Sequence, residues 1–368
     1  MASEIPPDII TEILYYLPAK SAGRFRCVSK EWKSLLSSPH FIKTHQIKRN
    51  QNHIISIHTD ASLYSLPLNV DNFNEKTVST KVDLNSRYVK SVFVHGSCNG
   101  LVLVSSVDSQ KKYALVLFNP MTRELTEIGL PSYRYDETDF VRNRFIMIGF
   151  GYDSLTDDYK ITLYFLISLD CMIVHVYSLK SSTWKQVDSC YNYSFDMMIH
   201  GVFVDGFIHC FAKRRCDGLR VILGFSLADE KFNEVPSPDI VDDDCKLVDL
   251  GGKLGIFLKS VGEVWLMNEY GVKESWTNII LEGLNKTGND LSFGQAWWLN
   301  DFRSILFQPM IYKTGKIVIV ANCRSRMFIF DNEGRCFLEN IKINNSRMMS
   351  YQVSYVESLV SPKLIRNN

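Results

Sequence analysis

The sequence has neither a long hydrophobic run nor an excess of charge of one sign. Its longest apolar candidate, residues 161–169, contains Thr162 and Ser168 and falls short of the ~18 residues that a membrane helix needs. The N-terminus lacks the basic and apolar segments of a signal peptide. Lys and Arg number 41 against 40 Asp and Glu, so no global field attracts nucleic acid or an anionic membrane. We therefore expect a protein of the cytoplasm and/or nucleus, with no nucleic acid and no membrane among its partners.

Motifs for catalysis and for metal binding are also missing. The nine cysteines are odd in number and never spaced as Cys-x-x-Cys, which speaks against a disulfide framework and a zinc site. There is no Gly-x-Ser-x-Gly and no His-Glu-x-x-His, and Gly149-Phe150-Gly151 lacks the third glycine of a phosphate loop. Asp157-Asp158 is expected to be a solvated turn. We expect no catalytic residue, no metal and no cofactor.

Residues 5–41 carry the clearest helical signal. Apolar residues fall at helical spacing in three bursts, over residues 9–17, 25–28 and 32–36. Asp8, Ser21 and Ser29 are the expected N-caps, while Pro18 is expected to end the first helix and Pro39 the third. Three helices of about ten residues each expose more apolar surface than they can bury together, because units below ~40 residues rarely fold unaided. This region therefore needs a partner.

The same stretch closely resembles the F-box, through which receptors of cullin–RING ubiquitin ligases bind a Skp-family adaptor. The matching motifs are Ile5-Pro6-Pro7-Asp8, Glu12-Ile13-Leu14, Leu17-Pro18-Ala19-Lys20-Ser21 and residues 24–32. The resemblance implies an adaptor-facing and core apolar set of Ile5, Pro6, Ile9, Ile13, Leu14, Leu17, Pro18, Phe25, Val28 and Trp32. Ile5 and Ala22-Gly23 replace leucines of the usual pattern, which predicts a somewhat weaker F-box. The alternative is an ordinary helical hairpin packed on the rest of the chain.

From about residue 53 the chain changes to short β-type runs separated by Gly, Asn, Asp and Pro. A strand ending in a polar turn recurs at intervals from 42 residues (226 to 268) to 63 residues (268 to 331). The six copies are residues 63–66, 116–120, 175–179, 223–227, 264–268 and 327–331. A short second strand follows most copies, and a Gly-centred strand precedes many. Trp184, Trp265 and Trp276 fall at what look like equivalent positions, which predicts core packing.

Repeats of roughly 40 to 50 residues with four strands each are typical of β-propeller blades. We predict a small all-α N-terminal region of three helices followed by an all-β domain, a six-bladed, kelch-like β-propeller. Residues 351–360 are then free to pair with the first blade and close the ring. Because the intervals are irregular, a twisted β-sandwich of the same strands is the alternative.

The β region is also similar to the plant F-box-associated interaction domain, found in S-locus, kelch-like and immune-regulating F-box proteins. The resemblance rests on residues 118–124, 150–160, 176–179, 228–232, 269–276 and 355–359. It implies a domain that recognises a substrate rather than one that performs chemistry. The predicted organisation is an F-box at 1–46, a linker at 47–52 and the recognition domain at 53–368.

Together these resemblances imply the substrate-recognition subunit of a Skp–cullin–F-box ubiquitin ligase, which holds an unidentified target protein for ubiquitination and degradation. Catalysis would then come from proximity, and the chain would supply no nucleophile. An adaptor-bound scaffold without ligase function and a propeller enzyme are the alternatives. Trp297 and Trp298 lie outside both the repeat and the F-box, so we predict that they bind the target. Sequence does not give the identity of that target.

Overall fold

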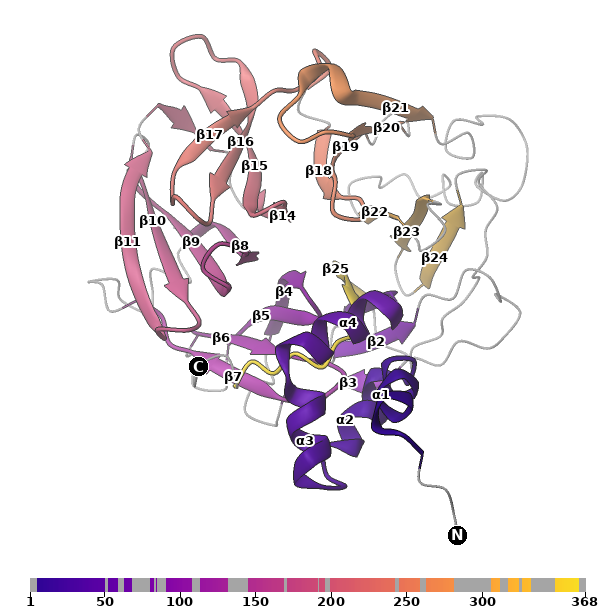
Figure 1. Cartoon of the computed structure of the whole chain (residues 1–368). Coiled ribbons are helices and arrows are strands. Elements are labelled where there is room, and N and C mark those ends of the chain that lie inside the picture. Colours follow the sequence, from indigo (N-terminus) through magenta and orange to yellow (C-terminus); the bar gives the residue numbers. More distant parts are fainter. Residues whose placement is uncertain are drawn as a thin grey trace.

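Helices occupy the first part of the chain and strands the remainder (Figure 1). The computed structural model describes residues 5–49, 52–58, 63–67, 80–82, 84, 91–107, 113–131, 145–168, 171–190, 192–195, 199–241, 245–258, 263–280, 306–311, 317–323, 326–331 and 348–363.

The N-terminal region has four helices, so the prediction of three was wrong. They are α1 (Pro7–Tyr15), α2 (Ala19–Phe25), α3 (Lys30–Ser37) and α4 (Pro39–Arg49). The third helix ends before Pro39, as predicted, and the missed helix begins at this same proline. Proline is tolerated at the first helical position because its missing N–H would have no partner there. Helix α4 also includes residues 47–49 of the predicted linker.

One of the three predicted N-caps is correct. The side chain of Ser29 accepts a hydrogen bond from the backbone N–H of Trp32 at 3.1 Å. Asp8 and Ser21 do not cap, because α1 and α2 begin earlier, directly after Pro6 and Pro18.

The described strands form six sheets, which we number along the chain. Sheet 1 contains β25 (Met348–Val356), β1 (Asn52–His58), β2 (Leu63–Pro67) and β3 (Thr80–Val82). Sheet 2 contains β4 (Ser91–Cys98), β5 (Leu101–Val107), β6 (Tyr113–Phe118) and β7 (Leu125–Ile128). Sheet 3 contains β8 (Phe145–Asp153), β9 (Asp158–Ser168), β10 (Cys171–Ser178), β11 (Thr183–Cys190) and β13 (Ile199–His200).

Sheet 4 contains β12 (Tyr193–Ser194), β14 (Val202–Val204), β15 (Phe207–Arg214), β16 (Arg220–Ser226) and β17 (Phe232–Val235). Sheet 5 contains β18 (Cys245–Asp249), β19 (Leu254–Leu258), β20 (Glu263–Met267) and β21 (Trp276–Ile280), with a short 3-10 helix, η1 (Lys273–Ser275), before its last strand. Sheet 6 contains β22 (Leu306–Ile311), β23 (Ile317–Cys323) and β24 (Arg326–Asp331).

The sheets follow one another around a ring, an arrangement that is propeller-like and not a sandwich (Figure 1). Strand β25 pairs antiparallel with β1, as predicted, so the end of the chain closes onto its first sheet. Pairing stops at Val356, and residues 357–360 leave the sheet instead of extending it. The expected four strands per blade hold for three sheets, while two sheets have five and one has three within the described residues.

The sequence repeat corresponds to a fixed place in each sheet. Its six copies lie on β2, β6, β10, β16, β20 and β24. Each is the third strand when the count starts at the strands that contact one another around the ring, which are β25, β4, β8, β14, β18 and β22. The short second strands are β7, β11, β17 and β21, the fourth strands in the same count. The prediction of equivalent positions was wrong for Trp265, which lies on a third strand.

Trp184 and Trp276 do occupy equivalent positions, at the start of β11 and β21. The indole Nε1–H of Trp184 donates to Gly129 O at 2.6 Å, and that of Trp276 donates to Pro236 O at 2.9 Å. Each acceptor directly follows the fourth strand of the preceding sheet. The two tryptophans therefore join neighbouring sheets through the same contact.

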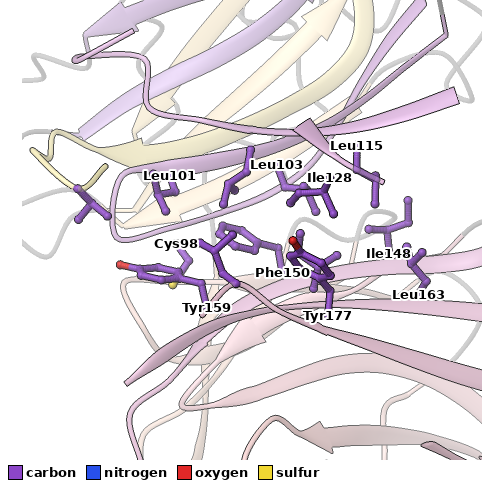
Figure 2. Close-up of a cluster of buried hydrophobic side chains, with 14 of the residues drawn as sticks. Cys98, Leu101, Leu103, Leu115, Ile128, Ile148, Phe150, Tyr159, Leu163 and Tyr177 are labelled. Atoms are coloured by element: carbon purple, nitrogen blue, oxygen red, sulfur yellow. The ribbon is translucent and has the colours of Figure 1, made fainter. Parts of the chain in front are cut away.

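Most of the core lies between adjacent sheets. Figure 2 shows Leu101, Leu103 and Leu115 of sheet 2 facing Ile148 and Phe150 of sheet 3. Similar clusters join sheets 3 and 4 and sheets 4 and 5. Burying one such side chain contributes about 1.5–3 kcal/mol, so these contacts hold the sheets in fixed relation.

Candidate functional site: the apolar face of the helical region

Helix α1 carries apolar side chains on two faces. Ile10, Leu14 and Leu17 are spaced four and three residues apart and pack in the helical core, where Leu14 is 2% exposed. A second row, which we call the α1 stripe, consists of Ile5, Ile9, Ile13 and Tyr16. These four side chains are 58%, 53%, 52% and 58% exposed.

Leaving a row of four large apolar side chains exposed to water is energetically unfavourable. A helix that is hydrophobic on every side is normally buried on every side, and contiguous exposed apolar patches mark interaction sites. Covering a side chain of this size completely contributes about 1.5–3 kcal/mol, of which the exposed half is still available to a partner. The exposure of these side chains makes the α1 stripe the candidate binding surface of the helical region.

The structure divides the ten predicted adaptor residues into three groups. The exposed ones are Ile5, Pro6, Ile9, Ile13, Pro18 and Val28; the half-buried ones are Leu17, Phe25 and Trp32; Leu14 is buried. The half-buried group packs against the helical core. Sequence reasoning missed Tyr16 and Ile47, which are 58% and 70% exposed. The helical spacing from Ile9 and Ile13 could have identified Tyr16.

Contacts between α1 and α4 hold the α1 stripe in place. The rings of Tyr15 and Phe41 stack with centroids 4.7 Å apart, and Lys48 Nζ lies 5.0 Å above the Tyr15 ring and 5.1 Å above that of Tyr16. Lys48 also pairs with Glu12. The helix that sequence reasoning missed thus supports the helix that carries the exposed surface.

A segment from the far end of the chain completes the helical core. We call residues 357–361 the C-terminal strap. Leu359 is fully buried among the core residues of α1, α2 and α3. The Arg26 guanidinium donates from Nη2 to Leu359 O and to Leu36 O, both at 2.8 Å. Burial lowers the pKa of Arg26, an effect that the nearby carboxylate of Glu124 partly offsets.

The strap also lies beside Ala22-Gly23, which stand where the usual F-box pattern has leucines. Ala22 is fully buried, and a Cβ placed on Gly23 would lie 3.8 Å from Leu359 Cδ2. Leu359 of the strap therefore packs on the part of α2 that carries Ala22-Gly23. The weaker F-box stays a prediction.

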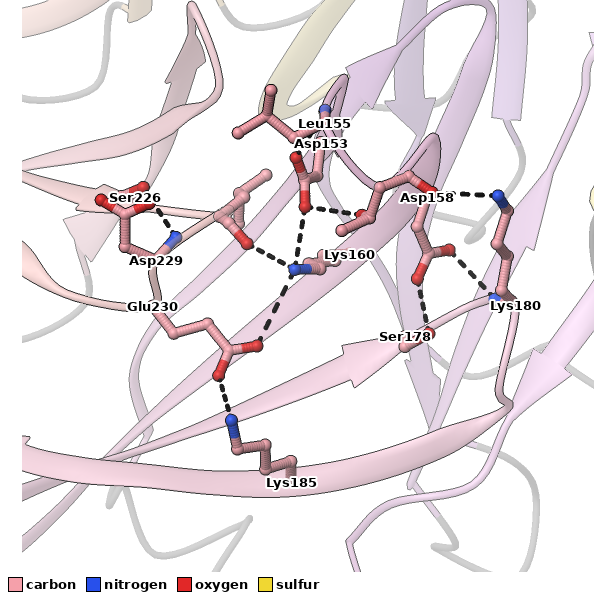
Figure 3. A network of polar contacts seen from close by, with 12 residues as sticks. Asp153, Leu155, Asp158, Lys160, Ser178, Lys180, Lys185, Ser226, Asp229 and Glu230 are labelled. Atoms are coloured by element: carbon pink, nitrogen blue, oxygen red, sulfur yellow. Dashed lines mark hydrogen bonds and ion pairs between the residues drawn. The ribbon is translucent and has the colours of Figure 1, made fainter.

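The buried charges of the β domain have structural roles (Figure 3). Lys160 Nζ lies 3.0 Å from Asp153 Oδ2 and donates to Leu227 O, joining sheets 3 and 4. Asp153 caps its own turn, as predicted, by accepting from Leu155 N and Thr156 Oγ1. Burial raises the pKa of Asp153, but hydrogen bonds from Thr156 and Lys160 outweigh it and leave the pKa below its ordinary value.

The expected solvated pair Asp157-Asp158 is only half right. Asp157 is exposed, whereas Asp158 is 4% exposed and accepts from Ser178 Oγ and the Lys180 backbone N–H. Both carboxylates of the hairpin that are buried, Asp153 and Asp158, are thus occupied by turn-forming contacts.

Within the described ranges, no group of three or more His, Cys, Asp or Glu side chains is placed to hold a metal ion. The described helices include none that is both long and apolar enough to cross a bilayer. Trp297 and Trp298, the predicted target-binding residues, lie outside the described residues.

Comparison with known proteins covers almost the whole chain. Residues 2–44 match the F-box domain, and residues 54–362 match the F-box associated beta propeller domain. The F-box protein CPR1 of Arabidopsis thaliana is 28% identical over 98% of this chain and 88% of its own length. The Arabidopsis F-box protein At3g07870 is 29% identical over 74% of this chain and 71% of its own length. The F-box/kelch-repeat protein At3g23880, from the same plant, is 25% identical over 88% of this chain and 89% of its own length.

Proposed function

The chain belongs to the plant F-box proteins with an F-box-associated β-propeller domain, and we propose that it is the substrate receptor of a Skp–cullin–F-box ubiquitin ligase. The α1 stripe is the observation that carries the proposal. Four large apolar side chains on and directly beside α1 remain about half exposed, while the other face of this helix is already buried. In this proposal a Skp-family adaptor covers that row and links the chain to a cullin and its RING partner.

The β domain has the other task, which is to hold a target protein. Loops on a rigid scaffold are the usual place for recognition. Buried apolar clusters and the two tryptophan contacts between sheets supply that rigidity here. Trp297 and Trp298 are the proposed target contacts, because large aromatic side chains often dominate the energy of protein interfaces.

The chain itself does no chemistry in this account. It raises the local concentration of target lysines near a ubiquitin-charged partner, and proximity replaces a catalytic side chain. Ubiquitination and proteasomal degradation in the cytoplasm or nucleus are the proposed outcome.

We further propose that the six sheets are the six blades of one closed propeller. The innermost strands support this, because β25, β4, β8, β14, β18 and β22 each contact the next, and β22 returns to β25. A closed ring protects every inner edge from pairing with other chains.

Reconstitution with purified partners tests the proposed function. The full chain, a Skp-family adaptor, a cullin and its RING subunit should elute as one complex that discharges a ubiquitin-loaded conjugating enzyme. A chain that binds the adaptor but never recruits the cullin would be a scaffold and not a receptor. The variant with Ile9→Asp and Ile13→Asp, which keeps the β domain intact, should capture targets without delivering them to the ligase.

A further inference from the structure

The C-terminal strap contacts both parts of the molecule through described side chains. On the helical side, Leu359 is buried in the core, and Glu357 Oε2 accepts a hydrogen bond from the backbone N–H of Ala19 at 3.2 Å. Ala19 is the first residue of α2. A carboxylate at that position satisfies an N–H that has no partner within the helix and complements the helix dipole.

On the β side, the strap is held by the turns of sheet 2. Asn119 Nδ2 donates to Ser358 O at 3.0 Å and to Val360 O at 2.8 Å, while Asn119 Oδ1 accepts from Met121 N within its own turn. Met121 in turn packs against the helical core. Asn119 therefore fixes the strap to a turn that itself contacts the helices.

Gly100 shows how closely the strap approaches sheet 2. A Cβ at this position would lie 2.4 Å from Ser358 Cβ and 2.7 Å from Val356 O. Contacts this short would force the β4–β5 turn or the strap to move. The tight β4–β5 turn thus leaves room for the strap only because residue 100 has no side chain.

From these contacts we infer that the C-terminal strap positions the adaptor-binding helices on the β domain and holds them in one fixed orientation. Residues 357–361 are inserted between the helical region and the β domain. Leu359 is buried in the helical core, and Asn119 of the β domain holds Ser358 and Val360. Strand β25, from which the strap emerges, pairs with β1, the first strand after α4. Both chain segments that leave the helical region are therefore anchored in the same sheet.

The consequence for ubiquitin transfer rests on the proposed function, whereas the fixed orientation does not. A receptor whose adaptor-binding helices swing freely would present its target over a wide range of positions. A strap that removes this freedom keeps the target lysines within one region relative to the ligase. Leu359, Glu357 and Asn119 are positioning residues in this sense, since none of them belongs to the exposed α1 stripe.

The test measures the distance between the helical region and the β domain directly, in the absence of an adaptor. Spin labels are introduced at Lys33 in α3 and at Ser154 in the β8–β9 turn through a genetically encoded keto amino acid. Both side chains are exposed. The wild-type chain should give one narrow distance distribution by pulsed electron resonance.

Two variants loosen the strap from opposite sides. Gly100→Ala acts on the β side and Leu359→Ala on the helical side. Gly206→Ala is a matched control, because Gly206 has the same φ of +81° but no atom within 4 Å of an added Cβ. Leu219→Ala, at a leucine that is 58% exposed, controls for the second variant.

We expect both strap variants to give distributions about twofold wider than wild type, with both controls unchanged. Distance distributions as narrow as that of the wild type in both Gly100→Ala and Leu359→Ala would overturn the inference. If the wild-type chain bound no adaptor, the proposed function would be rejected. The distance measurement would still test whether the strap fixes the helical region on the β domain.

Discussion

His209 on β15 gives a prediction of how the stability of the fold changes with pH. Its side chain is fully buried between sheets 4 and 5. Nδ1 lies 3.1 Å from Val202 O, and Nε2 lies 2.7 Å from the hydroxyl of Tyr270. Because a carbonyl oxygen only accepts, Nδ1 carries the hydrogen of its contact with Val202 O. A neutral ring fits both contacts, with Nδ1–H donating to Val202 O and the Tyr270 hydroxyl donating to Nε2.

Burial lowers the pKa of His209 from 6.5 to about 4, although the hydrogen bond to Val202 opposes the shift. A histidine with a lowered folded pKa stabilises the fold above its ordinary pKa and loses that contribution as the pH falls toward the folded value. Linkage then predicts a loss of about 2 kcal/mol of unfolding free energy from this residue between about pH 7.5 and about pH 5.

Urea unfolding of the wild type and of His209→Gln at both pH values isolates this contribution. The variant should be less stable than wild type at the higher pH, because the packing around Tyr270 is disturbed, but it should lose about 2 kcal/mol less on acidification. Other groups, including His175 with its pKa lowered by burial, titrate in both proteins and cancel in the difference. Equal acid sensitivity in the two proteins would show that His209 is not held neutral by the fold.

Three further changes test other parts of the structure. Trp276→Phe removes the indole donor between sheets 4 and 5 and should cost about 1 kcal/mol in urea unfolding, and an unchanged midpoint would refute that contact. Lys160→Met leaves the buried carboxylate of Asp153 without its ion-pair partner and should lower the free energy of unfolding by about 3–5 kcal/mol. Adding Asp153→Asn should restore part of this loss, and no recovery in the double variant would argue against the pairing. Replacing Trp297 and Trp298 by alanine should weaken capture of the target roughly thirtyfold without changing thermal stability, whereas a collapse of stability would make them core residues.

The repeat could be predicted because it depends on local chemistry. A strand that ends in a polar turn recurs at one place in each sheet, and the turn residues are visible in the sequence, as with Asn119 and Asp153. The same reasoning correctly placed the closing strand β25 against β1. Strand number per sheet could not be predicted, since short strands such as β12 and β13 are defined by their pairing and not by their composition.

The helical region shows where local reasoning fails. Proline can mark both the end of one helix and the start of the next. Pro39 does both, because α3 ends at Ser37 just before it, as predicted, and the unpredicted α4 begins at it. Two apolar rows on α1 look alike in the sequence, and only packing distinguishes the buried Leu14 from the exposed Ile13. The strap was missed for a different reason. Leu359 meets α2 from more than three hundred residues away, and no periodicity connects the two.

The central claim is that the α1 stripe binds a Skp-family adaptor. Isothermal titration of the adaptor into the full chain should give saturable binding to the wild type. Ile9→Asp with Ile13→Asp should abolish binding, because the interface would bury two unpaired carboxylates at a cost of several kcal/mol. Leu155→Asp, at a leucine that is 82% exposed in the β8–β9 turn, should bind like wild type. Equal affinity of the double variant and the wild type, with both folded, would contradict the account.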